Sequence, residues 1–238
     1  MVSVEQLEKN YNDVLSRVRT AAVNCDRNPA DIKVLAVSKT HNHTVIEQAI
    51  ESHIPIFAES YAQEFRDKYQ LLSDNYTKIL SCEFHFIGHL QRNKVKYVAP
   101  FVSTIHTVDD LSLAEEIDKQ CGRLKKKIDV LIQVNTSEEK SKSGVHPKEC
   151  LPLAIRLLEL SNIQLVGLMT IGTFSDNEII IRKEFSLLRS CLDEINKTTG
   201  LGLKELSMGM SHDFEIAIQE QATMVRVGTS IFGERKYY

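Results

Sequence analysis

The sequence has little of what marks several specialised classes of protein. Its 238 residues include no tryptophan, 10 glycines and 5 prolines, and these glycines and prolines never cluster into a linker. No uninterrupted apolar run approaches the roughly 20 residues that span a bilayer. The start is polar and amphipathic and lacks the apolar core of a secretory signal. We therefore expect neither a secreted chain nor a membrane partner.

The sequence also has few cysteines and a small net charge. The 5 cysteines lie far apart, which favours reduced thiols in a cytoplasmic protein over a disulfide framework or a metal site. With 29 basic and 32 acidic side chains, the formal charge of -3 gives no general attraction to nucleic acid. The remaining composition, 42% hydrophobic and 26% charged, is that of an ordinary globular protein. We expect a single domain over residues 1–238.

Short apolar runs alternate with longer amphipathic segments along the chain. Continuous apolar runs are typical of parallel strands that are covered on both faces. The expected strands are residues 33–39, 56–59, 84–88, 104–108, 129–135, 165–171, 203–208 and 225–228. Apolar residues at helical spacing predict helices over residues 4–18, 111–124, 151–158 and 185–195, with Asp109 and either Ser175 or Asp176 as N-caps.

This alternation of strands and helices predicts the fold class. Repeated about eight times, it indicates an α/β protein with a (β/α)8 or TIM barrel, preceded by an extra N-terminal helical segment over residues 1–30 that packs on the barrel. A doubly wound open sheet is the alternative. In a barrel, functional groups are expected where strands end and loops begin.

Lys39 closes the first expected strand, in VLAVSKTH. Burial of an ammonium group favours its neutral form, and a neutral lysine amine is what Schiff-base chemistry with an aldehyde requires. The alternative is a lysine whose head simply reaches solvent at a strand end.

The last two expected strands end in groups that suit an anion. Gly228 and Thr229 begin a Gly-Thr-Ser turn that leads into a helix start, and Ser211 follows the seventh strand. Phosphate commonly binds after strands 7 and 8 of a barrel, and strand 8 neighbours strand 1. Together with Lys39, this turn predicts a site for an aldehyde that carries a phosphate.

Other polar residues have simpler interpretations. His85 is expected to form a structural hydrogen bond in the core. Glu59 and Ser60 end the second strand and are expected to face the same barrel mouth. The polar segment 140–144 after the fifth strand is expected to lie at the rim of that mouth.

The stretches that carry these residues, taken in order, resemble the pyridoxal phosphate homeostasis protein family (YggS/PROSC-like). They are VLAVSKTH, FAESYAQEF, FHFIGHLQRNKVKYV, IHTVDD, VLIQVNTSEEKSKSGV, LVGLMTIG, ELSMGMSHDFEIAI and VRVGTSIFGERKY. The resemblance implies a single-domain barrel like the N-terminal half of alanine racemase (fold type III), which carries pyridoxal 5′-phosphate (PLP) on a lysine.

The resemblance also implies roles for individual residues. Lys39 matches the lysine that holds PLP as a covalent aldimine, and Arg226 matches the arginine directed at the pyridine nitrogen. Ser60 stands where the family usually has asparagine, so a hydroxyl replaces an amide near the cofactor. The other implied contacts are Ser207 and Met208 near the ring, and Ser211, Gly228 and Thr229 in the phosphate cup.

The leading hypothesis is a cytoplasmic PLP-binding protein of vitamin B6 homeostasis with little or no catalytic turnover. A two-base racemase needs a base on each face of the ring, and alanine racemases draw one from a second domain or a partner subunit, for which this chain has no room. The same absence favours a monomer, whose expected partners are PLP and B6-dependent apoenzymes. The alternatives are a PLP-dependent amino-acid racemase or lyase, a cofactor-free class I aldolase, and an interaction protein with a vestigial site.

Overall fold

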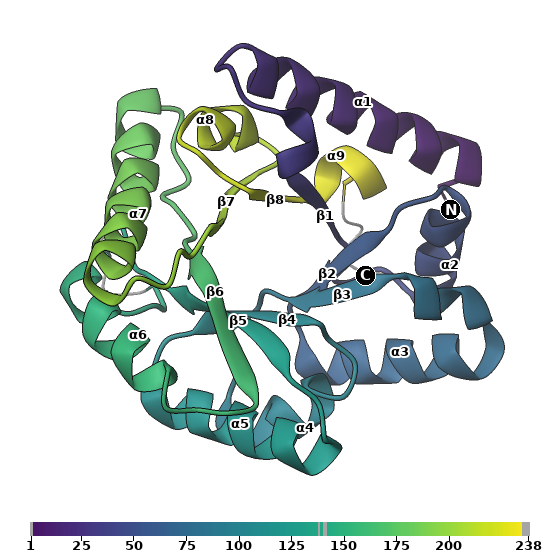
Figure 1. The fold of residues 1–238 in the computed structure, drawn as a ribbon. Helices are drawn as coiled ribbons and strands as arrows, with labels where there is room; N and C mark the ends of the chain where they lie inside the picture. The colour runs from purple at the N-terminus through teal and green to yellow at the C-terminus, as the bar shows by residue number, and fades with distance from the viewer. Residues whose placement is uncertain (1, 138, 140–141, 235–238) are drawn as a thin grey trace.

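The computed structural model describes residues 2–137, 139 and 142–234, which form a closed barrel of eight parallel strands (Figure 1). Neighbouring strands pair in chain order, and β8 pairs with β1 to close the sheet on itself. The strands are β1 (Lys33–Val37), β2 (Ile56–Glu59), β3 (Glu83–Phe86), β4 (Thr104–Val108), β5 (Ile128–Gln133), β6 (Ile163–Met169), β7 (Glu205–Met210) and β8 (Met224–Val227). The closed ring confirms the predicted barrel and excludes the open sheet.

Helices surround this ring and cover its outer face (Figure 1). The helices are α1 (Val4–Val23), α2 (His43–Glu51), α3 (Ala62–Asn75), α4 (Val95–Val98), α5 (Leu111–Leu124), α6 (Cys150–Leu157), α7 (Glu178–Thr199), α8 (Phe214–Gln219) and α9 (Thr229–Phe232). Helices α2 to α8 each connect two consecutive strands, the arrangement that parallel strands require. Within the described residues, no helix is both long and apolar enough to cross a membrane.

Helix α1 is the extra N-terminal helix that the sequence predicts. It lies outside the ring, beside α8 and α9 (Figure 1). Asn10 Nδ2 donates to the carbonyl of Ile231 at 2.8 Å, and Arg17 forms an ion pair of 2.6 Å with Glu215. The first helix is therefore attached to the last elements of the chain, next to the junction of β1 and β8.

Side chains along each strand alternate between the outer layer and the barrel interior. The outer hydrophobic cluster includes Phe84, Ile105, Leu206, Met208, Val225 and Val227, whereas a smaller inner cluster consists of Leu35, Val37, Ala58, Ile87 and Met224. By this alternation, the buried polar residues His85, His106, Ser207 and Arg226 point into the barrel. The interior of the barrel is thus partly polar.

Two strand ends differ from the prediction in a way that affects the site. β1 ends at Val37, so Lys39 lies in the loop that follows rather than on the strand. β7 covers Glu205–Met210 instead of residues 203–208, which moves its carboxyl end to Met210. Pairing with β6 and β8 sets this register, and a run of apolar residues does not reveal it.

Two predicted helix caps were wrong by one or two residues. Asp110, rather than Asp109, caps α5, and Asn177 caps α7 in place of Ser175 or Asp176. In both helices the observed cap is the side chain whose oxygen reaches a free N–H group of the first turn.

Candidate functional site

A pocket of about 340 Å³ opens at the carboxyl end of the barrel, within the size range of small-molecule sites. It is lined by Val37, Lys39, Ser60, Ile87, Ile171, Phe174, Met210, Ser211, His212, Arg226, Gly228 and Thr229. Six of the eight predicted site residues are among them: Lys39, Ser60, Ser211, Arg226, Gly228 and Thr229. Closure of the sheet between β1 and β8 is what brings the two ends of the chain to one pocket.

The loop that carries Lys39 is held on both sides of the lysine. Before it, Ser38 Oγ donates to Glu59 Oε1 at 2.8 Å. After it, the N–H of Thr40 donates to Glu64 Oε1 at 2.6 Å, and Thr40 has a φ of 70°, in the left-handed region. The two carboxylates therefore fix the backbone on either side of Lys39.

Lys68 joins these two carboxylates from α3. Its Nζ lies 2.6 Å from Glu59 Oε1 and 2.8 Å from Glu64 Oε1, and it donates to the carbonyl of Ser38 at 3.1 Å. Glu59 is fully buried, its Oε2 has no hydrogen-bond partner within the described residues, and burial raises the pKa of its carboxyl. Glu59 thus lies between β2 and α3, although the sequence predicts that it faces the mouth.

The opposite side of the pocket is formed by the loops after β7 and β8. The N–H of Gly228 donates to Ser211 Oγ at 3.3 Å, so these two loops are in contact. Thr229 begins α9, and the first N–H groups of a helix have no partner inside it. Gly209 has a φ of 90°, and a Cβ there would lie 2.6 Å from that of Ala217, so glycine lets α8 approach β7.

Arg226 reaches the pocket from inside the barrel. One guanidinium nitrogen donates to Ser207 Oγ at 2.8 Å and another to the carbonyl of Thr170 at 2.8 Å. Burial lowers the pKa of Arg226 to about 10, so the group stays charged at neutral pH. Ser207 is fully buried beneath Arg226 and does not line the pocket.

Met208, which the family resemblance implies to be near the cofactor ring, belongs to the outer hydrophobic cluster and is fully buried against the helices. Alternation along β7 explains this position, because Met208 and Ser207 point to opposite faces of the strand, and the carboxyl end of the strand lies two residues further on, at Met210. Met210 and Phe174 line the pocket and were missed. Phe174 is 82% exposed at the rim, and its ring centroid lies 4.8 Å from that of His212.

Two histidines continue the polar contacts through the barrel. His106 Nδ1 lies 2.9 Å from Ser207 Oγ, and His106 Nε2 lies 2.8 Å from His85 Nδ1. His85 is therefore hydrogen-bonded inside the barrel, as predicted. Burial, together with the nearby charge of Arg226, holds the pKa of His106 well below its ordinary value of 6.5.

This buried histidine predicts acid sensitivity of the fold. Below pH 6.5 the unfolded chain takes up a proton at His106 that the folded protein does not. The free energy of unfolding should therefore fall by up to about 1.4 kcal/mol for each pH unit below that value. Urea unfolding at several pH values gives the free energy of unfolding of wild type and of His106→Asn as a function of pH. Below pH 6.5 the wild-type free energy should fall more steeply with decreasing pH than that of the variant. Equal pH dependence of the two proteins would contradict the prediction.

A second pocket of about 260 Å³ adjoins the first and shares Lys39, Ser60, Ile87 and Ile171 with it. The polar segment after β5 lines this second pocket through Lys142 and Ser143, whereas residues 140 and 141 lie outside the described residues.

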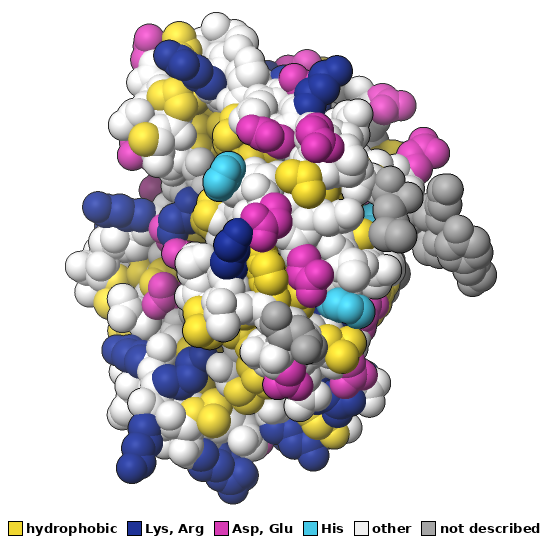
Figure 2. Space-filling model, turned by 90° about the vertical axis from the view of Figure 1, so that its right-hand side faces the viewer, with side chains coloured by type: hydrophobic (Ala, Val, Ile, Leu, Met, Phe, Trp, Pro, Cys, Tyr) yellow, Lys and Arg dark blue, Asp and Glu magenta, His cyan; other side chains and the backbone are white. Residues whose placement is uncertain are grey.

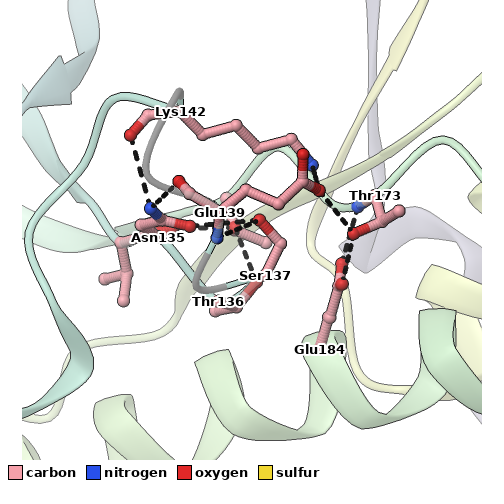
Figure 3. A network of polar contacts seen from close by, with 9 residues as sticks. Asn135, Thr136, Ser137, Glu139, Lys142, Thr173 and Glu184 are labelled. Carbon is pink, nitrogen blue, oxygen red and sulfur yellow. Dashed lines mark hydrogen bonds and ion pairs between the residues drawn. The ribbon is translucent and has the colours of Figure 1, made fainter.

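Figure 3 shows how this part of the rim is held together. Lys142 Nζ donates to Glu139 Oε1 at 2.6 Å, and Thr173 Oγ1 lies 3.0 Å from the same oxygen. Thr173 also donates through its N–H to Glu184 Oε2 at 2.7 Å. The loops after β5 and β6 and helix α7 are therefore connected beside the pocket.

The barrel and the arrangement of its mouth define a known class of protein. Residues 2–236 match the family model described as alanine racemase, N-terminal domain, and the chain belongs to that family. It is 43% identical over 224 residues to the pyridoxal phosphate homeostasis protein of Aquifex aeolicus (strain VF5), covering 94% of this chain and 96% of the relative. The resemblance to the pyridoxal phosphate homeostasis proteins is thereby confirmed.

Solved structures agree with this assignment. PipY of Synechococcus elongatus PCC7942, solved with PLP bound, is 28% identical with a TM-score of 0.82, covering 95% of this chain and 100% of PipY. Alanine racemase of Clostridium difficile 630 is 17% identical with a TM-score of 0.76, and the match covers 99% of this chain but 58% of the racemase. At this identity, the match to the racemase is evidence of a common barrel fold.

Proposed function

We propose that this chain is a PLP-binding protein of vitamin B6 homeostasis that holds the cofactor on Lys39 and releases it with little or no catalytic turnover. The observation that carries the proposal is one pocket that contains a lysine after β1, an arginine on β8, and two hydroxyls after β7 and β8. The names of the relatives and the PLP bound to PipY support the same cofactor.

The lining residues fit the parts of this cofactor. PLP supplies an aldehyde that condenses with a neutral lysine amine and releases water. Lys39 provides the amine, and Ser60 is a further polar contact at the same end. Because Arg226 stays protonated, it can donate a hydrogen bond to the ring nitrogen but not a proton, which leaves the ring a weak electron sink. This favours storage of the cofactor over turnover.

Borohydride reduction followed by peptide mass mapping tests the proposal directly. Reduction converts a PLP–lysine linkage into a stable secondary amine, so purified protein incubated with PLP should carry the label on the peptide that contains Lys39. Label confined to other lysines, or no label after saturation with PLP, would refute the proposed function.

The hydroxyls opposite Lys39 are expected to bind the phosphate, together with the N–H groups around Gly228. A hydrogen bond to a charged group contributes about 1.5–3 kcal/mol, so Ser211→Ala with Thr229→Ala should weaken PLP binding by at least about a hundredfold. Equilibrium dialysis measures the dissociation constant. Ser230→Ala is the matched control, since Ser230 lies in the same turn but does not line the pocket. Unchanged affinity in the double variant would contradict the assignment.

We further infer that residues 1–238 act as one monomeric unit in the cytoplasm and deliver PLP to B6-dependent apoenzymes. The five cysteines are all free thiols, which suits a reducing compartment. Figure 2 shows acidic as well as basic side chains scattered over one face of the molecule, in keeping with the net charge of -3 and with no role in binding nucleic acid.

A further inference from the structure

A chain of polar contacts crosses the barrel interior from the pocket to the opposite end. It starts at Arg226 on β8 and passes through Ser207 on β7 and His106 on β4 to His85 on β3. From there His85 Nε2 lies 3.5 Å from Glu83 Oε2, at the first residue of β3. The first four members of this series of contacts are each at most 4% exposed: Arg226, Ser207, His106 and His85. The contacts are therefore shielded from water up to Glu83.

The chemistry of these groups fixes the direction of the hydrogen bonds. A guanidinium only donates, so Ser207 Oγ must accept from Arg226. Among the contacts of the described residues, the one remaining acceptor for the Ser207 proton is His106 Nδ1, at 2.9 Å. A neutral His106 that accepts at Nδ1 carries its proton on Nε2.

The same reasoning extends to the second histidine. His106 Nε2–H donates to His85 Nδ1 at 2.8 Å, which requires that His85 Nδ1 is unprotonated. His85 then carries its own proton on Nε2 and points it at the Glu83 carboxylate. Every donor in the chain therefore points away from Arg226 and toward a carboxylate at the far end of the barrel.

Arg226 needs such support. Within the described part of the chain, it forms no ion pair with a carboxylate, and the two neutral oxygens of Ser207 and Thr170 accept from it. Burial lowers the pKa of Arg226, and the nearby charge of the buried Asp213 opposes that shift by raising the pKa, without forming an ion pair with the guanidinium. A buried cation with no counter-ion in direct contact is costly unless oriented dipoles stabilise it. The aligned hydrogen bonds that run from Ser207 to the Glu83 carboxylate provide such dipoles and stabilise the charge of Arg226 from a distance.

We propose that His106 and His85 are positioning residues for Arg226, which turn the lone pairs of the Ser207 hydroxyl toward the guanidinium and so hold it ready for the cofactor ring. This rests on the proposed function only for the identity of the ring. The donor-to-acceptor direction of the hydrogen bonds does not depend on PLP, because it follows from contacts within the protein.

The direction can be read in the wild-type protein without cofactor. Nitrogen-15 NMR of labelled histidines distinguishes the two neutral tautomers, with His106→Asn and His85→Asn used to assign the signals. We expect the tautomer with the proton on Nε2 and a bare Nδ1 for both residues. A proton on Nδ1 of either histidine would overturn the proposal, whether or not the protein binds PLP.

Three variants test the effect on the site. His106→Leu removes the acceptor of the Ser207 proton, so PLP should bind about tenfold more weakly and the absorption band of bound PLP should shift. His106→Asn keeps an oxygen near the position of Nδ1 and should restore both the affinity and the band. Thr104→Val, two residues earlier on the same buried strand and outside the chain of contacts, is the control and should match wild type.

The outcomes separate the two hypotheses. If folded His106→Leu binds PLP with unchanged affinity and an unchanged band, the positioning role is wrong while the proposed function stands. If wild type fails to bind PLP, the proposed function is wrong, and the NMR tautomers still decide the direction of the chain. If His106→Leu does not fold, Ser207→Ala takes its place, and wild-type affinity and band in that variant would equally overturn the positioning role.

Discussion

Replacing Lys39 with alanine should abolish the covalent retention of PLP. Lys39 is the lysine among the described residues that lines the main pocket, and the aldehyde of PLP requires an amine at that place. After borohydride reduction and gel filtration, the variant should carry no PLP above background, whereas wild type carries it in stoichiometric amount. Phosphate contacts would still permit weak, reversible binding, measurable by dialysis.

Lys142→Ala is the matched control for this experiment. Lys142 lines the adjoining pocket, so it is the lysine best placed to compete for the aldehyde, and its ammonium is paired with Glu139 at 2.6 Å. We expect Lys142→Ala to keep the label on Lys39. Full labelling of Lys39→Ala would contradict the assignment of PLP to Lys39. Loss of the label in Lys142→Ala, with labelling of Lys39→Ala intact, would instead assign PLP to Lys142.

Replacing Lys68 with methionine should destabilise the protein by about 3–5 kcal/mol, because it leaves the buried carboxylate of Glu59 without its cation. The same change removes a donor to the carbonyl of Ser38, so the variant should also retain PLP less well. Urea unfolding measures the first effect. Lys78→Met is the control: it breaks a solvent-exposed pair with Glu51, so the free energy of unfolding should change far less than in Lys68→Met.

A double variant separates the charge from the packing at this position. Glu59→Leu combined with Lys68→Met removes both charges, and uncharged pairs of similar size often match buried ion pairs in stability. The double variant should therefore recover most of the lost free energy of unfolding. Ser38 would lose both of its partners in the double variant, Lys68 Nζ at its carbonyl and Glu59 Oε1 at its hydroxyl, so we expect PLP retention to stay impaired. Equal destabilisation of the single and double variants would show that packing, not charge, holds α3 on the barrel.

Much of the fold could be predicted from the sequence, because parallel strands buried on both faces appear as continuous apolar runs. Lys39 and the Gly228–Thr229 turn could be found for a related reason: they are polar groups directly after such runs. Met210 could not, because Met208 and Met210 are alike as possible carboxyl ends of β7, and only pairing with its neighbours shows where the strand ends.

Contacts between residues far apart in the sequence could not be predicted either. Ser207 and His106 are 101 positions apart, and nothing in either local sequence indicates that barrel closure will bring them to 2.9 Å. Likewise, Glu59 ends an apolar run and could point either into the mouth or toward the helices. The alternation along β2 decides between them, since Ala58 takes the inner position.

The pairing of β8 with β1 has a consequence for how the protein is made. During synthesis the lysine emerges from the ribosome early, whereas the guanidinium and the Thr229 hydroxyl emerge last. On the proposed assignment of the site, a growing chain carries the amine of Lys39 long before the phosphate contact at Thr229 exists. We therefore expect stable retention of PLP only once translation has passed β8.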